Sequence, residues 1–439
     1  MKAPGHWLFL AGALAAAPAL AAEPWPAEAH AAAVHLTDLD AGLNVQNWSG
    51  AHWNPGTRTL WLACNSGYFW ALVEGGPYGF RVATNAAGIQ AKWSPGGDFE
   101  GICQADSNSN LVYVMDENGY IREYDVSNYS QTNQTRTWDI RAVCTNTVNA
   151  GGEGLAFVPD EFLRRQRFSN SNGVPYVSTN GMGGLMFVGY QQDGYLYAFD
   201  LKRATGTYGS IGRYQTGRAE TADLEFDRRS GKLYVWHNTG SNYLEIVELG
   251  SYADGAGRRL RPLAEYYGPR TGNLEGFAVV PSASSNAAGG CVVTDDNNAA
   301  GEAVLWYRQF QPSDDTDADS LSDTAELWHF GSVTQTVGAA DDDSDGLSNA
   351  AELAAGTDPT NALSVLIQHA PAATSRELVL SWQSATGRTY AIRSATVMGL
   401  GFTNAVQAGI GDTAPLNVVT LDVSGLVSNT FFQIVTAPP

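Results

Sequence analysis

A short phrase returns several times in the first two thirds of this chain of 439 residues, and an apolar strand follows each copy. Each copy is a hydroxyl or carboxylate side chain, usually followed by glycine, and successive copies lie roughly 50 to 70 residues apart. A unit repeated at such a period indicates one supersecondary element built several times. The copies are Trp48-Ser49-Gly50, Phe99-Glu100-Gly101-Ile102, Gly152-Glu153-Gly154-Leu155 and Leu274-Glu275-Gly276-Phe277, with a less regular copy at Ala222-Asp223-Leu224-Glu225-Phe226.

Further strands follow inside each repeat and are separated by turns at Gly or Asn. Thr59-Leu60-Trp61-Leu62 is a second strand of this kind, and Gly119-Tyr120-Ile121-Arg122-Glu123-Tyr124-Asp125 is a third. Alternating aromatic residues between such turns are typical of twisted antiparallel sheets. We therefore predict a β-propeller over residues 33–311, with five blades for the five phrases. A sixth blade could lie in the long spacing before Asp223.

The innermost strands of propeller blades line a central channel, so the equivalent positions of the repeats converge on its axis. The polar residues of the phrases would then form a ring of oxygens that binds a ligand. Buried carboxylates this close cannot all stay ionised without partners. A bound cation, protonation of some members, or hydrogen bonds from backbone amides of the next blade would each relieve them. The irregular fourth phrase leaves open which of its two acids joins the predicted ligand-binding set, which is Ser49, Glu100, Glu153, Asp223, Glu225 and Glu275.

Carboxylates cluster after Phe310, and no Lys or Arg occurs between Arg308 and Arg376. Two segments there have side-chain ligands at positions 1, 3, 5, 9 and 12 of a calcium loop, and position 7 offers its carbonyl. Two such carboxylates repel by about 4 kcal/mol at about 4 Å and an effective dielectric of about 20, and a bound Ca²⁺ removes this penalty. The predicted metal ligands are Asp315, Asp317, Asp319, Leu321, Asp323 and Glu326 in the first loop and Asp341, Asp343, Asp345, Leu347, Asn349 and Glu352 in the second; Ser320 stands where the second loop has Gly346.

The second loop, followed by Gly356-Thr357-Asp358-Pro359, resembles the bacterial thrombospondin type 3 repeat and, more loosely, dockerin and EF-hand loops. The resemblance implies a calcium-stiffened spacer in a secreted or surface protein, and we place this spacer at residues 312–363. From Ser364 the chain returns to β-type sequence, as in Leu378-Val379-Leu380-Ser381-Trp382. For residues 364–439 we predict a small β-sandwich.

The first residues have the features of a secretion signal: a positive start at Lys2, an apolar run from Trp7 to Ala17, and a small-x-small site at Ala19-Leu20-Ala21. We predict a signal peptide over residues 1–21 and a secreted or periplasmic protein with no membrane span. The net charge of −20 argues against nucleic acid as a partner. The four cysteines follow no metal or redox spacing, so they are either buried small hydrophobic residues or members of one or two disulfides.

The phrases around Glu100, Glu153 and Glu275 also resemble SdiA-regulated propellers and the esterase-like, phytase-like propellers. This resemblance implies a secreted or periplasmic propeller whose central site holds a metal such as calcium, and it assigns no catalytic residues. The chain has no nucleophile elbow, HExxH or P-loop motif. We therefore predict a non-catalytic ligand-binding platform with an extracellular polymer or cell-surface component as its partner. The alternative is a metal-dependent extracellular hydrolase of phosphoesters, lactones or glycans that acts at the channel.

Overall fold

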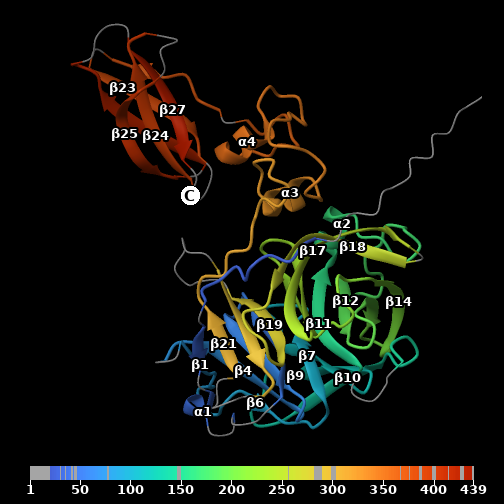
Figure 1. Ribbon diagram of the computed structural model, residues 1–439. Helices are drawn as coiled ribbons and strands as arrows, with labels where there is room; N and C mark the ends of the chain where they lie inside the picture. Colours follow the sequence, from blue (N-terminus) through green and yellow to red (C-terminus); the bar gives the residue numbers. More distant parts are fainter. Residues whose placement is uncertain are drawn as a thin grey trace, which may run out of the picture.

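Strands dominate the computed structural model in Figure 1 and helices are few, which confirms the prediction of a mainly β protein. None of the helices in the described ranges is long and apolar enough to cross a membrane. Of the predicted signal peptide, residues 1–19 lie outside the described part. The structure describes residues 20–29, 31–34, 36–40, 43, 47–76, 79–145, 150–255, 257–280, 289–297, 303–365, 367–374, 376–384, 388–397, 402–413, 415–425 and 430–437.

Five antiparallel sheets occupy the part of the chain that carries the phrase, and each is open. The first contains β2 (Trp48–Asn54), β3 (Thr59–Cys64), β4 (Tyr68–Glu74) and β5 (Phe80–Val82), with β6 (Lys92–Trp93) also paired to β4. The second contains β7 (Phe99–Cys103), β8 (Leu111–Asp116), β9 (Tyr120–Asp125) and β10 (Asn133–Asp139). The third contains β11 (Gly152–Pro159), β12 (Gly184–Tyr190), β13 (Leu196–Lys202) and β14 (Thr207–Tyr214).

The fourth and fifth sheets follow the same order from the phrase outward. The fourth contains β15 (Asp223–Asp227), β16 (Lys232–Thr239), β17 (Ser241–Asp254) and β18 (Gly257–Tyr267). The fifth contains β19 (Leu274–Val280), β20 (Gly290–Asp295), β21 (Val304–Tyr307) and β1 (Ala32–Val34). Because β1 comes from the start of the chain and pairs with β21, the last sheet is completed by the first strand. Two short helices lie beside the sheets, α1 (Leu36–Leu39) and α2 (Asp160–Arg165).

The strands that carry the phrase, β2, β7, β11, β15 and β19, lie on the inside and contact one another in a ring. Each contacts the next in sequence, and β19 contacts β2. Apolar clusters fill the space between neighbouring sheets; for example, Trp236 of the fourth sheet stacks on Phe277 of the fifth at a centroid distance of 5.6 Å. The fold is therefore propeller-like. All four cysteines are buried and free, as expected of small hydrophobic residues.

The acidic stretch forms two loops, each ending in a short helix, α3 (Asp323–His329) and α4 (Asn349–Ala355). Serine caps begin both helices: the hydroxyl of Ser322 accepts from the Ala325 amide, and that of Ser348 accepts from the Ala351 amide. Leu327 and Val333 join the apolar cluster between the fourth and fifth sheets. The first half of the spacer is therefore packed against the sheets rather than extended away from them.

Two three-stranded antiparallel sheets form the C-terminal part. One contains β22 (Ala372–Ala373), β23 (Glu377–Gln383) and β26 (Leu416–Asp422), and the other contains β25 (Asn404–Gly411), β24 (Thr389–Ala395) and β27 (Phe431–Ala437). Leu380 and Trp382 of the first sheet share one buried cluster with Tyr390 and Ile392 of the second. The two sheets therefore share a core.

Candidate cation sites

The phrase produces a β-bulge in four of the five inner strands. The pairing register shifts between Trp48 and Gly50 in β2 and between Phe99 and Gly101 in β7, and β11 and β19 shift at the same place in their phrases. The residues inside each bulge leave the ladder, and bulges commonly redirect side chains at functional sites. The fourth phrase lies on β15, whose pairing with β16 has no shift.

The glycine of the phrase allows neighbouring inner strands to approach each other closely. A Cβ on Gly101 would lie 2.4 Å from the carbonyl oxygen of Glu153, and a Cβ on Gly50 would lie 2.6 Å from the carbonyl oxygen of Glu100. A Cβ on Gly154 would lie 2.6 Å from the backbone of Asp223, and a Cβ on Gly276 would lie 2.9 Å from the backbone of Ser49. Real side chains do not fit at these distances, so this part of the phrase is required by the contact between sheets.

The two acids of the fourth phrase are both held by neighbouring strands. Asp223 accepts from the backbone amides of Ala51 at 3.1 Å and Phe277 at 2.9 Å, which belong to β2 and β19. Glu225 accepts from the amide of Trp53 at 3.3 Å and lies 2.8 Å from Nδ1 of His52. Burial raises the pKa of Asp223 and of Glu225, while these donors oppose the rise.

The other members of the predicted ring differ in their partners, and Glu275 accepts from the Asn273 amide group at 2.8 Å. The Ser49 hydroxyl lies 2.8 Å from a carboxyl oxygen of Glu275 and also contacts the side chain of Asn65, and its single hydrogen can serve one of these two acceptors at a time. Glu153 is 7% exposed, and among the described residues no donor reaches its carboxyl group. Burial and the nearby acids Glu100 and Glu275 raise its pKa well above the usual range. Burial, together with Glu275, does the same at Glu100, and burial raises the pKa of Glu275 to about 8.

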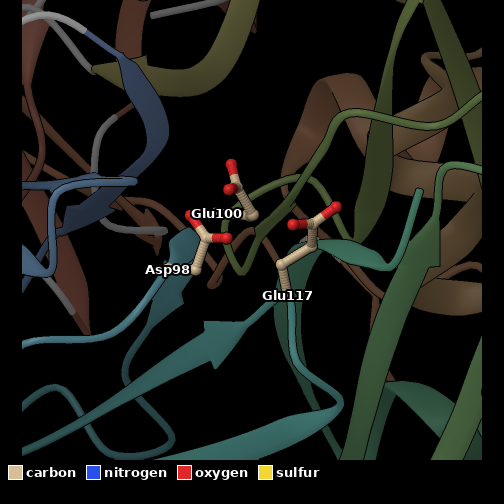
Figure 2. Close-up of side chains that lie close together, drawn as sticks. All are labelled: Asp98, Glu100 and Glu117. Carbon is tan, nitrogen blue, oxygen red and sulfur yellow. The ribbon is translucent and has the colours of Figure 1, made fainter. Parts of the chain in front are cut away.

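Glu100 also belongs to a tighter group with Asp98 and Glu117, whose ligand oxygens all lie within 4.8 Å of one another. Figure 2 shows these three side chains close together at the start of β7 and the end of β8. The backbone amide of Glu117 donates to the carbonyl of Asp98 at 2.8 Å, which fixes the two residues side by side. Burial, with added repulsion from Asp98, raises the pKa of Glu117 to about 7.

Asp98 and Glu117 are absent from the predicted site. Glu117 lies on the turn after β8, and Asp98 directly precedes the second phrase. The register of β7 against β8, in which Phe99 is opposite Asp116, brings them together. Pairing the second phrase with the next strand as an antiparallel hairpin, with Phe99 opposite Asp116, would have placed Glu117 beside Asp98.

The two spacer loops share one backbone conformation. In each loop three aspartates, Asp315, Asp317 and Asp319 or Asp341, Asp343 and Asp345, have oxygens within 4.8 Å of one another. The position-1 aspartate accepts from the amide at position 6 in both loops, at 3.3 Å from Ser320 and 3.0 Å from Gly346. Both position-6 residues have positive φ, 81° at Ser320 and 97° at Gly346. Ser320 therefore adopts the turn that the second loop makes with glycine.

The glutamate at position 12 closes each loop from the first turn of the following helix. Glu326 and Glu352 are fully buried, and neither oxygen of Glu326 nor Oε2 of Glu352 has a partner in the described part of the chain. Burial, together with the loop aspartates, raises the pKa of Glu326 to about 8 and that of Glu352 to about 7. Buried carboxylates beside three aspartates lack the positive partner that such a group requires. A divalent cation with oxygen ligands would supply it.

The residues at positions 7 and 9 have other contacts. The amides of Leu321 and Leu347 donate at 2.8 Å to the position-5 aspartates. Asp323 pairs with the ammonium group of Lys232 at 2.8 Å and accepts from Thr316, and Asn349 donates to Thr336. Side-chain coordination by these two position-9 residues stays a prediction.

Comparison with known proteins identifies one segment. Residues 341–362 match the family model of the bacterial TSP3 repeat. This repeat is of a calcium-binding type, and the match begins at Asp341, the first predicted ligand of the second loop. The first loop lies outside the matched segment.

No curated protein matches the chain. Among solved structures, "Structure of Dos1 propeller" is 11% identical with a TM-score of 0.32, covering 57% of this chain and 53% of that one. "Crystal Structure of Mitotic Checkpoint Complex" is 13% identical with a TM-score of 0.32, covering 60% and 62%. The aligned part spans less than two thirds of either chain.

Proposed function

We propose that this is a secreted calcium-binding protein with a five-bladed β-propeller at residues 33–311, a calcium-stiffened spacer at 312–363 and a β-sandwich at 364–439. One observation carries the proposal: each acidic loop is closed by a fully buried glutamate, and within the described chain both oxygens of Glu326 and Oε2 of Glu352 lack a partner. The second of these loops lies in the matched repeat. Calcium at both loops would neutralise these groups and hold the spacer rigid.

The propeller serves as a ligand-binding platform in this proposal, with a cation or polar ligand at the channel. Asp98, Glu100 and Glu117 offer oxygens within 4.8 Å of one another. Glu153 is buried beside them, and no hydrogen-bond donor in the described ranges reaches it, so it favours a bound cation over a purely structural ring. Asp223 and Glu225 would instead act as clips between sheets, because neighbouring strands supply their donors. An extracellular polymer or a cell-surface component would be the partner of the assembled protein.

Calcium titration of the full mature chain by calorimetry, after treatment with a chelator, tests this proposal. Glu326→Gln, Glu352→Gln and Glu153→Gln should each remove one class of site or weaken it by at least about tenfold. Glu377→Gln, at an exposed position on β23, is the matched control and should bind as the wild type does. Unchanged binding in the Glu326→Gln, Glu352→Gln double variant would overturn the spacer sites, and unchanged binding in Glu153→Gln would overturn the channel site.

A metal-dependent extracellular hydrolase is the second candidate, and the carboxyl group of Glu117 favours it. A general base works best when its pKa lies near the working pH, and the pKa of Glu117 is raised to about 7 beside two possible metal ligands. Phosphoester, lactone and polysaccharide panels should be assayed with and without calcium. Calcium-dependent turnover that disappears in Glu117→Gln and Glu100→Gln would establish this function. Absence of turnover on every panel would favour the non-catalytic binding platform instead.

A further inference from the structure

The inner strands end at a second site, opposite to the carboxylates at their start. A cavity of about 290 Å³ lies where β2, β15 and β19 finish. Its volume lies just below the range for ligand pockets, about 300–1,000 Å³, so it suits a ligand no larger than a monosaccharide. The polar residues that line it include His52, Asn54, Gln104, Glu225, Asp227 and Arg228.

Arg228 is the unusual member of this lining. Its Nη2 donates to the carbonyls of Gln104 at 3.1 Å and Ala105 at 2.6 Å, and no carboxylate of the described chain lies within ion-pair distance of it. Burial lowers the pKa of its guanidinium. On a chain with a net charge of −20, a largely buried arginine that lacks an acidic partner is a strong sign of an anion site. Its remaining N–H groups are the donors that such an anion would use.

The acids that line the cavity are already occupied by other donors. Glu225 accepts from Trp53 and His52, and Asp227 accepts from the Ser230 hydroxyl at 2.7 Å and the Arg229 amide at 3.0 Å. They therefore do not take up the free N–H groups of Arg228.

His52 lines the same cavity and presents a second polar group. Its Nδ1 lies 2.8 Å from Glu225, so Nδ1 carries the proton that the carboxylate accepts. The other ring nitrogen, Nε2, has no partner among the residues that the structure describes and is available to a ligand. A ligand hydroxyl, which can donate or accept, would pair with Nε2 while the anionic group of the ligand accepts from Arg228.

The geometry points to a second ligand site of the propeller, formed by Arg228 and His52, for a small hydroxylated anion, either a carboxylate or a phosphate. This site goes beyond the calcium function proposed above, because it needs no metal and lies at the other end of the inner strands. A monosaccharide acid from an extracellular polymer and a phosphate share the chemistry that it recognises.

Calorimetric titration of the full mature chain, kept in chelator, tests this inference. Glucuronate and inorganic phosphate are the two probes, and glucose is the neutral match of glucuronate. At least one anion should bind while glucose does not, and the anion that binds identifies the source. Arg228→Gln, which keeps a donor for the two carbonyls, should weaken binding by at least about tenfold. Arg141→Gln, at an exposed arginine on the surface, is the control and should bind as the wild type does.

A second variant guards against misfolding of Arg228→Gln, which is checked by circular dichroism. His52→Asn keeps an amide donor for Glu225 but removes Nε2, so it should weaken anion binding with the fold intact. The inference fails if neither anion binds the wild type or if glucose binds equally well. It also fails if the folded variants bind as the wild type does. Anion binding that appears only with calcium would assign the anion to the carboxylate end and would likewise overturn it.

Discussion

Asp223 and Glu225 in the propeller-like sheets are as well buried as Glu326 and Glu352 in the spacer loops, but the two pairs differ in what surrounds them. Asp223 and Glu225 accept hydrogen bonds from backbone amides of neighbouring strands, so this part of the ring is satisfied by the fold. Glu326 and Glu352 have no such donors and close loops that already hold three aspartates. In the sheets, neighbouring strands therefore supply the partners of these two acids, whereas the buried glutamates of the loops await the cation that we propose for them. Glu153 is the exception within the sheets.

Lys232 connects the two regions, so its loss should have the largest effect. Its ammonium group, 3% exposed, lies 2.8 Å from both Asp314 and Asp323, and the Asp323 side chain is fully buried. Lys232→Met would leave a buried carboxylate unpaired, which typically costs about 3–5 kcal/mol. Urea unfolding at saturating calcium measures the loss. We expect the spacer to become protease-sensitive in the variant.

An exposed contact across the same interface supplies the control. Arg165 donates to the carbonyl of Trp328 at 2.8 Å and stacks on its ring, but the Arg165 side chain is exposed. Arg165→Met should therefore cost less than about 1 kcal/mol. Similar losses in both variants would mean that burial of the Lys232 pair is not what joins the regions.

Gly101 tests how closely the inner strands must pack. Alanine there would place its Cβ 2.4 Å from the carbonyl oxygen of Glu153 on the next inner strand. Gly101→Ala should destabilise the protein by about 3 kcal/mol, at the upper end of the cost of overpacking. Gly209→Ala is the control, since its nearest neighbour would be a side-chain atom of Ile211 at an ordinary 3.6 Å. Equal melting temperatures of the two variants would contradict the close approach.

Two substitutions within the ring should have opposite signs in chelator. Asp223→Asn turns an amide group toward backbone donors and should destabilise the protein by about 2 kcal/mol, since it leaves buried polar groups unsatisfied. Glu153→Gln replaces a buried carboxyl group whose ionised form no donor of the described chain stabilises, so it should be neutral or stabilising by about 1 kcal/mol. Denaturant melts of both variants measure the difference. Equal losses would show that Glu153 has a structural partner in the apo protein.

The repeated phrase was enough to predict the mainly β fold and the five inner strands. Its glycine recurs because neighbouring inner strands approach each other too closely there for a side chain. The two acidic loops were equally predictable, since their clustered aspartates and closing glutamates are close in sequence; calcium binding by them stays a prediction. Both of these signals depend on short-range spacing.

The contacts that the sequence did not reveal depend on strand register or on packing between separate elements. Asp98 reaches Glu117 only through the register of β7 on β8, and Lys232 reaches Asp323 across 91 residues. Arg228 gave no signal in the sequence because an arginine in a turn is usually a solvated residue. Its lack of an acidic partner is visible only once the cavity is known.

The smallest expected effect separates the two loops from each other. Ser320 and Gly346 occupy the same left-handed backbone position. A residue with a Cβ pays roughly 1–2 kcal/mol of steric energy there. Glycine avoids this cost but loses more conformational entropy on folding, which offsets part of the difference. Ser320→Gly should stabilise the calcium-bound first loop by about 1 kcal/mol, or about fivefold in affinity. Gly346→Ser should weaken the second loop by a similar amount, and because a Cβ there meets no atom within 4 Å, its cost comes from the backbone alone. Site-resolved calcium titration of the two variants measures both changes. If Ser320→Gly lowers the calcium affinity of the first loop, the Ser320 side chain itself stabilises that turn. The two loops would then be stabilised by different interactions despite their shared backbone conformation.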